Sequence, residues 1–287
     1  MEQISMKGLP ALVFPELAAF PFVSHLFTTR QGGVSEGEFS SLNLSFTRGD
    51  KEEAVIENFR RVANALSVTL DRFVFTDQTH GTVVGHVTKE DAGKGLTREK
   101  DYEGVDALIT DTPGLVLSAF FADCVPLFFV DPVHKAIGLA HAGWRGTVGR
   151  IGEAVVREME YAFGTDPQDI HAAIGPSICQ SCFEVDADVA LQFREAFMRD
   201  ERAVIRRKND EKYEIDLWYA NEIVLTDAGV PFDQITVGAL CTSCRKNLLF
   251  SHRATKGRRG NLGAFLMIRE PRFARTGHNR APAAGLI

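Results

Sequence analysis

The chain has 287 residues, of which 45% are hydrophobic and 24% are charged, and its formal net charge is −6. This is the composition of an ordinary globular protein, and the length allows a sizeable core. A negative charge is atypical of nucleic-acid-binding proteins, no apolar run reaches the roughly 18 residues of a membrane span, and no signal-peptide pattern opens the chain. We therefore expect a cytoplasmic protein, a monomer or small homo-oligomer, with no nucleic-acid or membrane partner.

The N-terminal third predicts a strand, a glycine loop and an amphipathic helix. Residues 22–29 form an apolar strand pattern, and Arg30 opens the glycine loop that follows. Asp50 with Glu53 three residues later is a capping-box pattern, and apolar residues at helical spacing follow up to residue 66. We therefore expect a helix that begins at Asp50. Arg30 is either a solvated surface residue or a cation held near a flexible backbone.

A single histidine stands at a predicted corner between two strands. Residues 73–76 and 82–88 are strand-like, and His80 lies between them, followed by Gly81. A lone histidine is more often a structural residue than a ligand. His80 gains interest only if other ligands lie nearby.

Two hairpins are predicted after a charged loop at residues 90–104. The first joins strands at 106–110 and 115–120 through a Pro-Gly turn. The second joins 127–130 and 136–140 through Asp131-Pro132-Val133-His134, with the proline at the position of the turn that requires a φ near −65°.

In the second hairpin, a two-residue turn centred on Pro132 and Val133 places Cys124 opposite His141. Cross-strand Cβ atoms lie about 4.5 to 5.5 Å apart, a separation that suits two ligands of one metal ion or a Cys–His nucleophile pair. A buried structural cysteine is the alternative. With His80, the pair would make the three-ligand set of a catalytic zinc, which keeps a fourth position open.

The remaining chain predicts alternating helices and strands in one domain. A Gly-bounded loop after His141 enters a helix and offers free N–H groups to anions. The expected helices are 147–163, 187–198 and 217–228, and the expected strands are 170–174, the segment ending at 216, 235–240 and 262–268. We predict a single-domain α+β fold spanning residues 1–287, with a mixed, largely antiparallel β core flanked by helices, an ordered core at about 20–270, and a tail from Pro271 that frays.

Four of the five cysteines form two C-x-x-C pairs, Cys179/Cys182 and Cys241/Cys244. About 60 residues separate the pairs, against about 15 to 20 in the usual zinc pattern. We therefore expect reduced packing residues rather than a structural zinc site.

The motifs together resemble the YlmD/YfiH family, long labelled laccase-domain or polyphenol oxidoreductase proteins and now regarded as purine nucleoside phosphorylases. The matching segments are TRQGGVS (29–35), SLNLS (41–45), QTHG (78–81), ADCVP (122–126), HAGWRGT (141–147), IGPSICQSCFEV (174–185), CT (241–242) and FSHR (250–253). They cover roughly residues 23–268.

The resemblance implies a zinc held by His80, Cys124 and His141, which would also be the catalytic residues. It implies phosphorolysis of adenosine, inosine, guanosine and methylthioadenosine, with adenosine deamination as a second activity. The substrates would then be purine nucleosides and phosphate. The phosphate needs cationic donors, for which the candidates are Arg30 and Arg145, and Asn43 is a candidate sugar or base contact.

Three other readings remain open at this stage. A metal-free hydrolase or deamidase would use Cys124 as nucleophile and His141 as base. A non-catalytic, metal-stabilised interaction protein would use the glycine loops as surfaces. A copper polyphenol oxidase is disfavoured, because the eight histidines include none of the H-x-H pairs expected of multicopper clusters.

Overall fold

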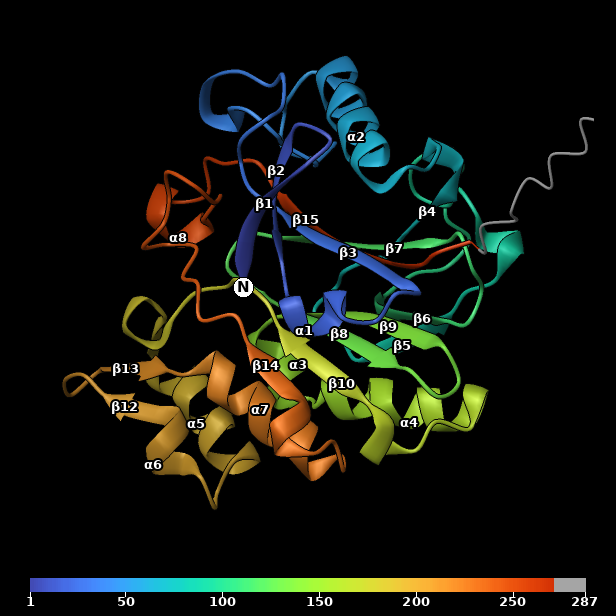
Figure 1. Cartoon of the computed structure of the whole chain (residues 1–287). Coiled ribbons are helices and arrows are strands. Elements are labelled where there is room, and N and C mark those ends of the chain that lie inside the picture. Colours follow the sequence, from blue (N-terminus) through green and yellow to red (C-terminus); the bar gives the residue numbers. More distant parts are fainter. Residues whose placement is uncertain (271–287) are drawn as a thin grey trace, which may run out of the picture.

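The computed structural model describes residues 1–270. Within them, two six-stranded sheets pack face to face, with helices covering their outer faces (Figure 1). Most neighbouring strands are antiparallel and a minority are parallel. The predicted α+β class, with a mixed, largely antiparallel core, is confirmed. The expectation for the tail lies outside the described residues.

The strands belong to two large sheets and one small one. The first sheet has the order β1 (Glu2–Met6), β2 (Leu9–Val13), β3 (Val23–Thr28), β15 (Leu262–Ile268), β7 (Val116–Phe121) and β4 (Phe73–Phe75). The second has the order β14 (Ile235–Val237), β10 (His171–Ile174), β8 (Val125–Asp131), β9 (Ala136–Ala142), β6 (Val105–Thr110) and β5 (Val83–His86). The third consists of β11 (Glu184–Asp186), β13 (Lys212–Ile215) and β12 (Ile205–Arg207).

The helices are mostly short. The α-helices are α1 (Pro15–Ala18), α2 (Glu52–Leu66), α3 (Trp144–Val148), α4 (Ile151–Phe163), α5 (Ala187–Ala196), α6 (Glu201–Val204), α7 (Leu217–Asp227) and α8 (His252–Thr255). Single 3₁₀ turns occupy Gly37–Phe39, Leu70–Arg72, Lys89–Asp91, Pro167–Asp169, Gln180–Cys182 and Phe232–Gln234. No helix within residues 1–270 is long and apolar enough to cross a lipid bilayer.

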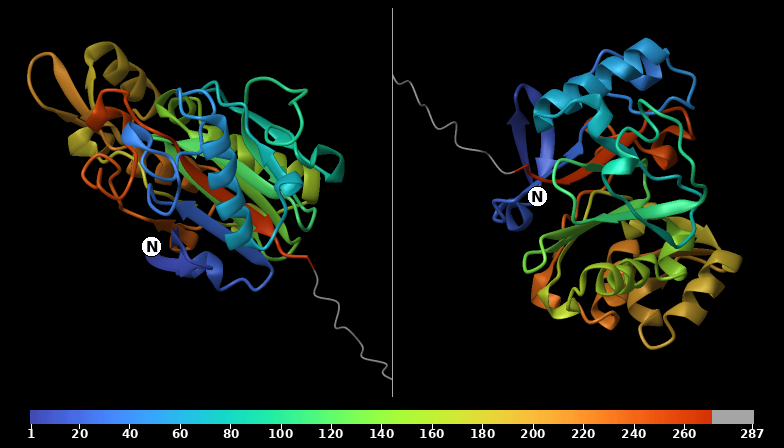
Figure 2. Two further views of the ribbon diagram at one scale, coloured as in Figure 1. Left: turned by 90° about the horizontal axis from the view of Figure 1, so that it is seen from above. Right: turned by 90° about the vertical axis from the view of Figure 1, so that its right-hand side faces the viewer.

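Figure 2 shows this sandwich of sheets and helices from two further directions. Apolar side chains fill three layers in it. Between the two sheets, Leu117 and Leu266 share a buried cluster with Phe128 and Leu139. Helices α4 and α7 cover the outer face of the second sheet, and α2 covers the outer face of the first. The strands of the central layers are buried on both faces, which explains why they read as continuous apolar runs.

The hairpin predicted between residues 106 and 120 is wrong. Strand β6 pairs with β9 and β5 in one sheet, whereas β7 pairs with β15 and β4 in the other. The Pro-Gly turn reverses the chain from one sheet to the next, and the Gly114 N–H donates to the Ile268 carbonyl. A turn pattern specifies a reversal, but it does not specify whether the two strands pair or pack face to face.

Two predicted helix starts are also corrected. Helix α2 begins at Glu52, and its preceding residue, Lys51, provides no side-chain cap; the Asp50 carboxylate instead accepts from Lys51 N and from Asn43 Nδ2. The predicted helix 147–163 is two helices, α3 and α4, because Arg150 adopts a left-handed φ of 63° between them. Residues 2–18, before the expected ordered core, already form β1, β2 and α1.

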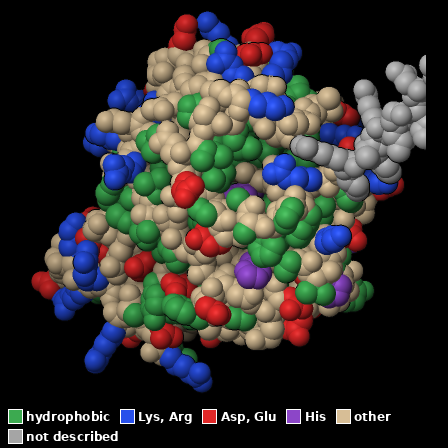
Figure 3. Space-filling model, in the orientation of Figure 1, with side chains coloured by type: hydrophobic (Ala, Val, Ile, Leu, Met, Phe, Trp, Pro, Cys, Tyr) green, Lys and Arg blue, Asp and Glu red, His purple; other side chains and the backbone are tan. Residues whose placement is uncertain are grey.

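On the face shown in Figure 3, basic and acidic side chains are interspersed over the surface, with no broad area of one sign. This distribution agrees with the modest net charge of −6.

Candidate metal centre and substrate cavity

The structure brings His80, Cys124 and His141 together from three separate stretches of the chain. One ligand atom from each lies within 4.8 Å of the others. His80 lies in the turn between β4 and β5, Cys124 directly precedes β8, and His141 is in β9. The set combines one sulfur and two nitrogen donors, which is a ligand set typical of zinc.

The hairpin that carries Cys124 and His141 is present as β8 and β9, but its predicted register is wrong. His141 pairs with Pro126, because the loop contains four residues, 132–135, rather than two. The Asp131 carboxylate shapes this longer loop by accepting from the N–H groups of Val133 and His134. Side chains alternate along a strand, so a shift of two positions keeps the same residues on the same face. The thiol and the imidazole therefore still meet.

Asp106, which the sequence analysis did not single out, organises the site. Its fully buried carboxylate accepts from the backbone N–H groups of Thr79, His80 and Gly81, at 3.0, 3.1 and 2.7 Å. These bonds hold the turn in which His80 adopts a φ of 66°. A charged residue inside the apolar strand VDALIT is the signal that was available, because Asp is almost never fully buried unless it is paired.

Asp106 also orients the second histidine. Nδ1 of His141 donates to Asp106 Oδ1 at 2.8 Å, which leaves Nε2 as the free nitrogen. A carboxylate that holds the rear nitrogen of a ligating histidine fixes the tautomer and ring orientation that a metal requires. One carboxylate thus positions both histidines.

Cys124 and His141 have strongly shifted pKa values. Burial opposes ionisation of the Cys124 thiol, but His141 and His80 outweigh it and lower the pKa of Cys124 to about 6. Burial also opposes protonation of His141, but Cys124 and Asp106 raise the pKa of His141 to about 9. Both shifts favour the thiolate form of Cys124 and the protonated form of His141. The thiolate is the form that binds metals.

The chain closes tightly around one side of the cluster. A Cβ atom at Gly143 would lie 2.6 Å from His80 Cδ2 and 3.4 Å from Cys124 Sγ, so only glycine leaves both ligands in place. On the other side all three residues line a cavity of about 490 Å³. Three ligands with an open side toward a cavity are the arrangement of a catalytic rather than a structural zinc.

The cavity has the size of a small-molecule site and combines aromatic and cationic walls. Phe46, Phe75 and Phe120 supply aromatic surface. Arg48, Lys100 and Arg259 supply positive charge, and Lys100 is already paired with Asp77.

Arg259 is an unusual residue of the cavity wall. It is 6% exposed, its Nε has no hydrogen-bond partner, and it forms no ion pair within residues 1–270. Burial lowers its pKa to about 10, and the nearby Arg48 contributes to this shift. A buried guanidinium beside a second arginine is a site that favours an anion.

The three predicted substrate contacts lie elsewhere. Arg30 donates to the carbonyls of Ser40 and Lys246 and stacks on Phe250, 4.6 Å from its ring centroid. Asn43 is buried, and its side chain bonds the backbone of Ser45 and Asn261 and the carboxylate of Asp50. Arg145 is exposed and stacks on Trp144 at 4.2 Å. Among the described residues that line the cavity, none of the three is present.

Comparison with known proteins agrees with this arrangement. The family model described as multi-copper polyphenol oxidoreductase laccase matches residues 24–269. "Purine nucleoside phosphorylase YlmD" of Bacillus subtilis (strain 168) is 38% identical over 245 residues, which are 85% of this chain and 88% of that protein. "Adenosine deaminase RL5", from an unknown prokaryotic organism, is 39% identical over 229 residues, covering 79% and 87% of the two chains.

Among solved structures, YlmD from Geobacillus stearothermophilus superposes with a TM-score of 0.86 at 39% identity, over 93% of this chain and 98% of that one. The chain belongs to the YlmD/YfiH family, whose family model is described as multi-copper polyphenol oxidoreductase laccase.

Proposed function

We propose that the protein is a zinc-dependent purine nucleoside phosphorylase that also deaminates adenosine. The observation that carries the proposal is the cluster of His80, Cys124 and His141, which opens into a cavity lined by Arg48 and Arg259; neither arginine forms an ion pair within residues 1–270. Relatives named purine nucleoside phosphorylase and adenosine deaminase support the same assignment. The substrates would be adenosine, inosine, guanosine or methylthioadenosine, with phosphate.

His80, Cys124 and His141 would hold the zinc, and Asp106 would keep both imidazoles in the ligating orientation. When bound, zinc supplies Lewis acidity, which polarises an oxygen or makes water more acidic. Copper is disfavoured, because the chain's eight histidines do not supply the multicopper clusters of a laccase.

Arg259 and Arg48 are the phosphate contacts that the cavity favours. Phosphorolysis requires phosphate at the anomeric carbon of ribose, and an arginine fork matches phosphate oxygens bidentately. Arg259 lines the cavity and is held in place by burial and by hydrogen bonds from Nη1 to the Gly260 carbonyl and Asn261 Oδ1. Arg30 and Arg145, proposed from the sequence, already have other partners outside the cavity.

The aromatic wall of the cavity suits the purine. The ring centroids of Phe75 and Phe120 lie 4.7 Å apart in an edge-to-face arrangement, and Phe46, at the surface, is 39% exposed. A purine ring gains contact area on such rings while its ribose faces the polar side of the cavity.

A metal-free Cys–His hydrolase remains the second candidate, because Cys124, His141 and Asp106 also form the sequence of contacts of a nucleophile, a base and an orienting carboxylate. It assigns no role to His80. The loss of one zinc equivalent in His80→Ala would therefore separate the two candidates.

The experiment is to incubate the purified protein with adenosine, with and without phosphate, and to separate the products. We expect adenine and ribose 1-phosphate only when phosphate is present, and slow formation of inosine without it. Cys124→Ala and His80→Ala should lose the zinc and both reactions. Arg259→Lys should raise KM for phosphate, because a lost ground-state contact weakens binding.

His86→Ala is the matched control, since His86 is an exposed histidine on β5 outside the cavity. It should keep zinc and turnover. Adenine release independent of phosphate would indicate a hydrolase. A Cys124→Ala protein with full zinc and full turnover would refute the proposal, and oxygen-dependent turnover of a phenol without nucleoside reaction would restore the oxidase reading.

A further inference from the structure

A second cluster of potential metal ligands lies outside the cavity. The four Sγ atoms of Cys179, Cys182, Cys241 and Cys244 lie within 4.8 Å of one another. The long separation of the two C-x-x-C pairs was the reason for expecting no shared site. The structure removes that reason.

Parallel pairing of β10 with β14 explains how the pairs meet. In this pairing Ile174 lies beside Val237, so both strands end at the same edge of the sheet. A further parallel bridge joins Ser177 to Cys241. Cys179 follows the end of β10 within a few residues, and Cys241 follows the end of β14 in the same way. The two C-x-x-C pairs therefore lie close together in space although they are far apart in the sequence.

The sulfur separations are compatible with four ligands of one metal ion. Cys182 Sγ lies 3.5 Å from Cys244 Sγ. A disulfide requires about 2.05 Å, whereas two sulfurs bound to one zinc at about 2.3 Å in tetrahedral geometry lie about 3.8 Å apart. The observed separation is therefore close to that of two ligands of one ion.

Backbone hydrogen bonds support this assignment. The N–H groups of Cys179 and Cys244 both point at Cys241 Sγ, at 3.3 and 3.4 Å. N–H groups directed at a sulfur stabilise its thiolate form. Cys241 is buried, Cys179 and Cys182 are half-buried, and Cys244 is exposed, so the four thiols lie at the edge of the core rather than inside it.

We propose that Cys179, Cys182, Cys241 and Cys244 form a structural zinc site. The zinc would join the connection between β10 and β11 to the segment between β14 and α8. With four protein ligands the site is closed, which is the arrangement of a structural rather than a catalytic zinc.

The four-cysteine site is connected to Cys124 by hydrogen bonds to Asp123. Ile178 N donates to the Asp123 carbonyl at 3.0 Å, and Thr242 Oγ1 donates to its carboxylate at 2.6 Å. Ile178 and Thr242 are the immediate neighbours of Cys179 and Cys241. Asp123 has a φ of 88° and directly precedes Cys124, so the four-cysteine site would hold the loop that presents the catalytic thiolate.

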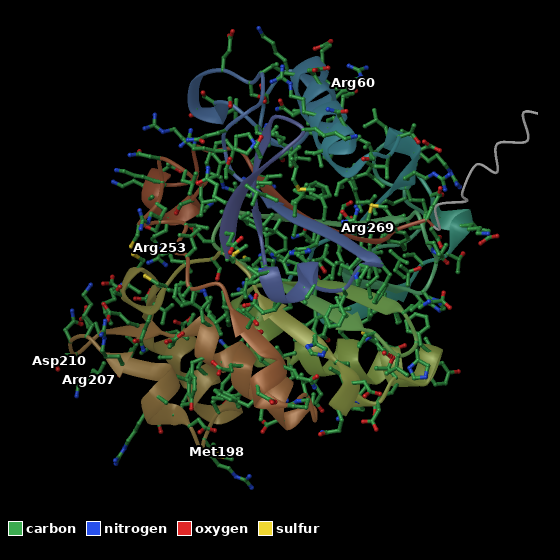
Figure 4. All side chains as sticks on the ribbon, in the orientation of Figure 1. Arg60, Met198, Arg207, Asp210, Arg253 and Arg269 are labelled. Atoms are coloured by element: carbon green, nitrogen blue, oxygen red, sulfur yellow. The ribbon has the colours of Figure 1, made fainter. Side chains whose placement is uncertain are left out.

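Arg253 completes the connection. Its guanidinium extends from α8 toward the β10–β11 connection, where it donates to the carbonyls of Cys182 and Glu184, and its own N–H donates to the Asp123 carboxylate (Figure 4). The cysteine site, Arg253 and Asp123 thus form one network.

The test is the zinc content of the full-length protein, measured by elemental analysis after removal of loosely bound metal. The parent should hold two equivalents, and Cys124→Ala should retain one. Cys244→Ser should lose one zinc equivalent, because it removes a ligand of the four-cysteine site. Cys244 is the most exposed of the four cysteines, so the substitution changes packing little. Lys246→Ala, an exposed position in the same loop, is the matched control and should retain both.

Cobalt substitution identifies the ligands that remain. Cys124→Ala loaded with cobalt should show the intense thiolate charge-transfer bands of a tetrahedral centre, and a chelator should lower its melting temperature. No zinc in Cys124→Ala, iron in place of zinc, or a disulfide between two of the four cysteines in the intact mass would overturn the proposal. These outcomes are independent of the proposed function: a parent with one zinc that Cys124→Ala keeps supports this site while refuting the catalytic zinc.

Discussion

A single buried carboxylate links the two histidines of the candidate metal centre. Asp106 accepts from three backbone N–H groups around His80 and from Nδ1 of His141. Burial opposes its ionisation, but these bonds outweigh burial and lower the pKa of Asp106. It stays a carboxylate at neutral pH and accepts from all its neighbours at once.

We expect Asp106→Asn to weaken zinc binding by about 10- to 100-fold, the usual effect of losing a partner behind a ligating histidine. The asparagine side chain would place an NH₂ group against N–H donors that the Asp106 carboxylate now accepts from. Competition with a chromogenic chelator measures the affinity.

Asp131→Asn provides the matched control. Asp131 is equally buried and also bonds a histidine, His134 Nδ1 at 2.8 Å, but it ends strand β8 at the hairpin loop, away from the cluster. Its substitution should reduce stability and leave zinc affinity unchanged. Equal losses of affinity in both variants would show that Asp106 acts only through stability.

His25 should make the fold sensitive to acid. It is 4% exposed, its Nε2 accepts from Phe14 N at 2.9 Å, and burial lowers its pKa to about 4. In the unfolded chain a histidine has a pKa of about 6.5. The unfolded state therefore binds more protons between these values, and stability falls as pH drops through this window, by about 2 kcal/mol at pH 5.

His25→Gln keeps an acceptor for Phe14 N but does not titrate. Urea unfolding at pH 7 and pH 5 should show a smaller loss of stability for this variant than for the parent. The exposed His86→Gln should behave like the parent. An unchanged pH dependence in His25→Gln would rule out His25 as the source.

At the scale of elements, the site depends on how strand β9 passes into helix α3. Gly143 precedes α3 with a φ of −65° and a ψ of 170°, which any residue adopts. Glycine is thus required by space rather than by backbone conformation: a Cβ would lie 2.6 Å from the His80 ring.

Gly143→Ala should therefore displace His80 and lower zinc occupancy and turnover while leaving the secondary structure intact. Zinc analysis and circular dichroism of the same sample test both statements. Gly152→Ala, inside α4, is the control, since the nearest atom to its Cβ is a flexible Leu225 methyl at 3.2 Å. Full zinc occupancy in Gly143→Ala would refute the steric argument.

At the scale of the whole molecule, the two six-stranded sheets share the apolar core that lies between them. We therefore expect the two sheets to unfold together. Both tryptophans, Trp144 and Trp218, lie against the outer side of the second sheet. Phe59 of α2 lies against the outer side of the first sheet, fully buried among Phe73 and Phe75.

Phe59→Ala should lower the free energy of unfolding by about 3 to 5 kcal/mol, and the tryptophan fluorescence should report the same shift as circular dichroism. Phe232→Ala, whose side chain is 67% exposed, should change little. A fluorescence transition that stays in place while the dichroism transition moves would show that the two layers unfold separately.

Local patterns in the sequence indicated many of the strands and helices and the candidate ligands, but not β1, β2 or the break between α3 and α4. Short apolar runs placed β8, β9 and β15, and the residues Cys124, His141 and His80 were identified from strand ends and turns. Such features depend on periodicity and turn chemistry within a few residues, which the sequence contains directly.

Only the tertiary structure decided which strands pair and which charges meet. It placed β6 and β7 in different sheets and brought Asp106 to both histidines. It also placed Arg259 in the wall of the cavity and brought the four cysteines together beyond the ends of β10 and β14. These outcomes depend on hydrogen bonds between residues far apart in the chain, and a strand buried on both faces carries no alternation to indicate its partner.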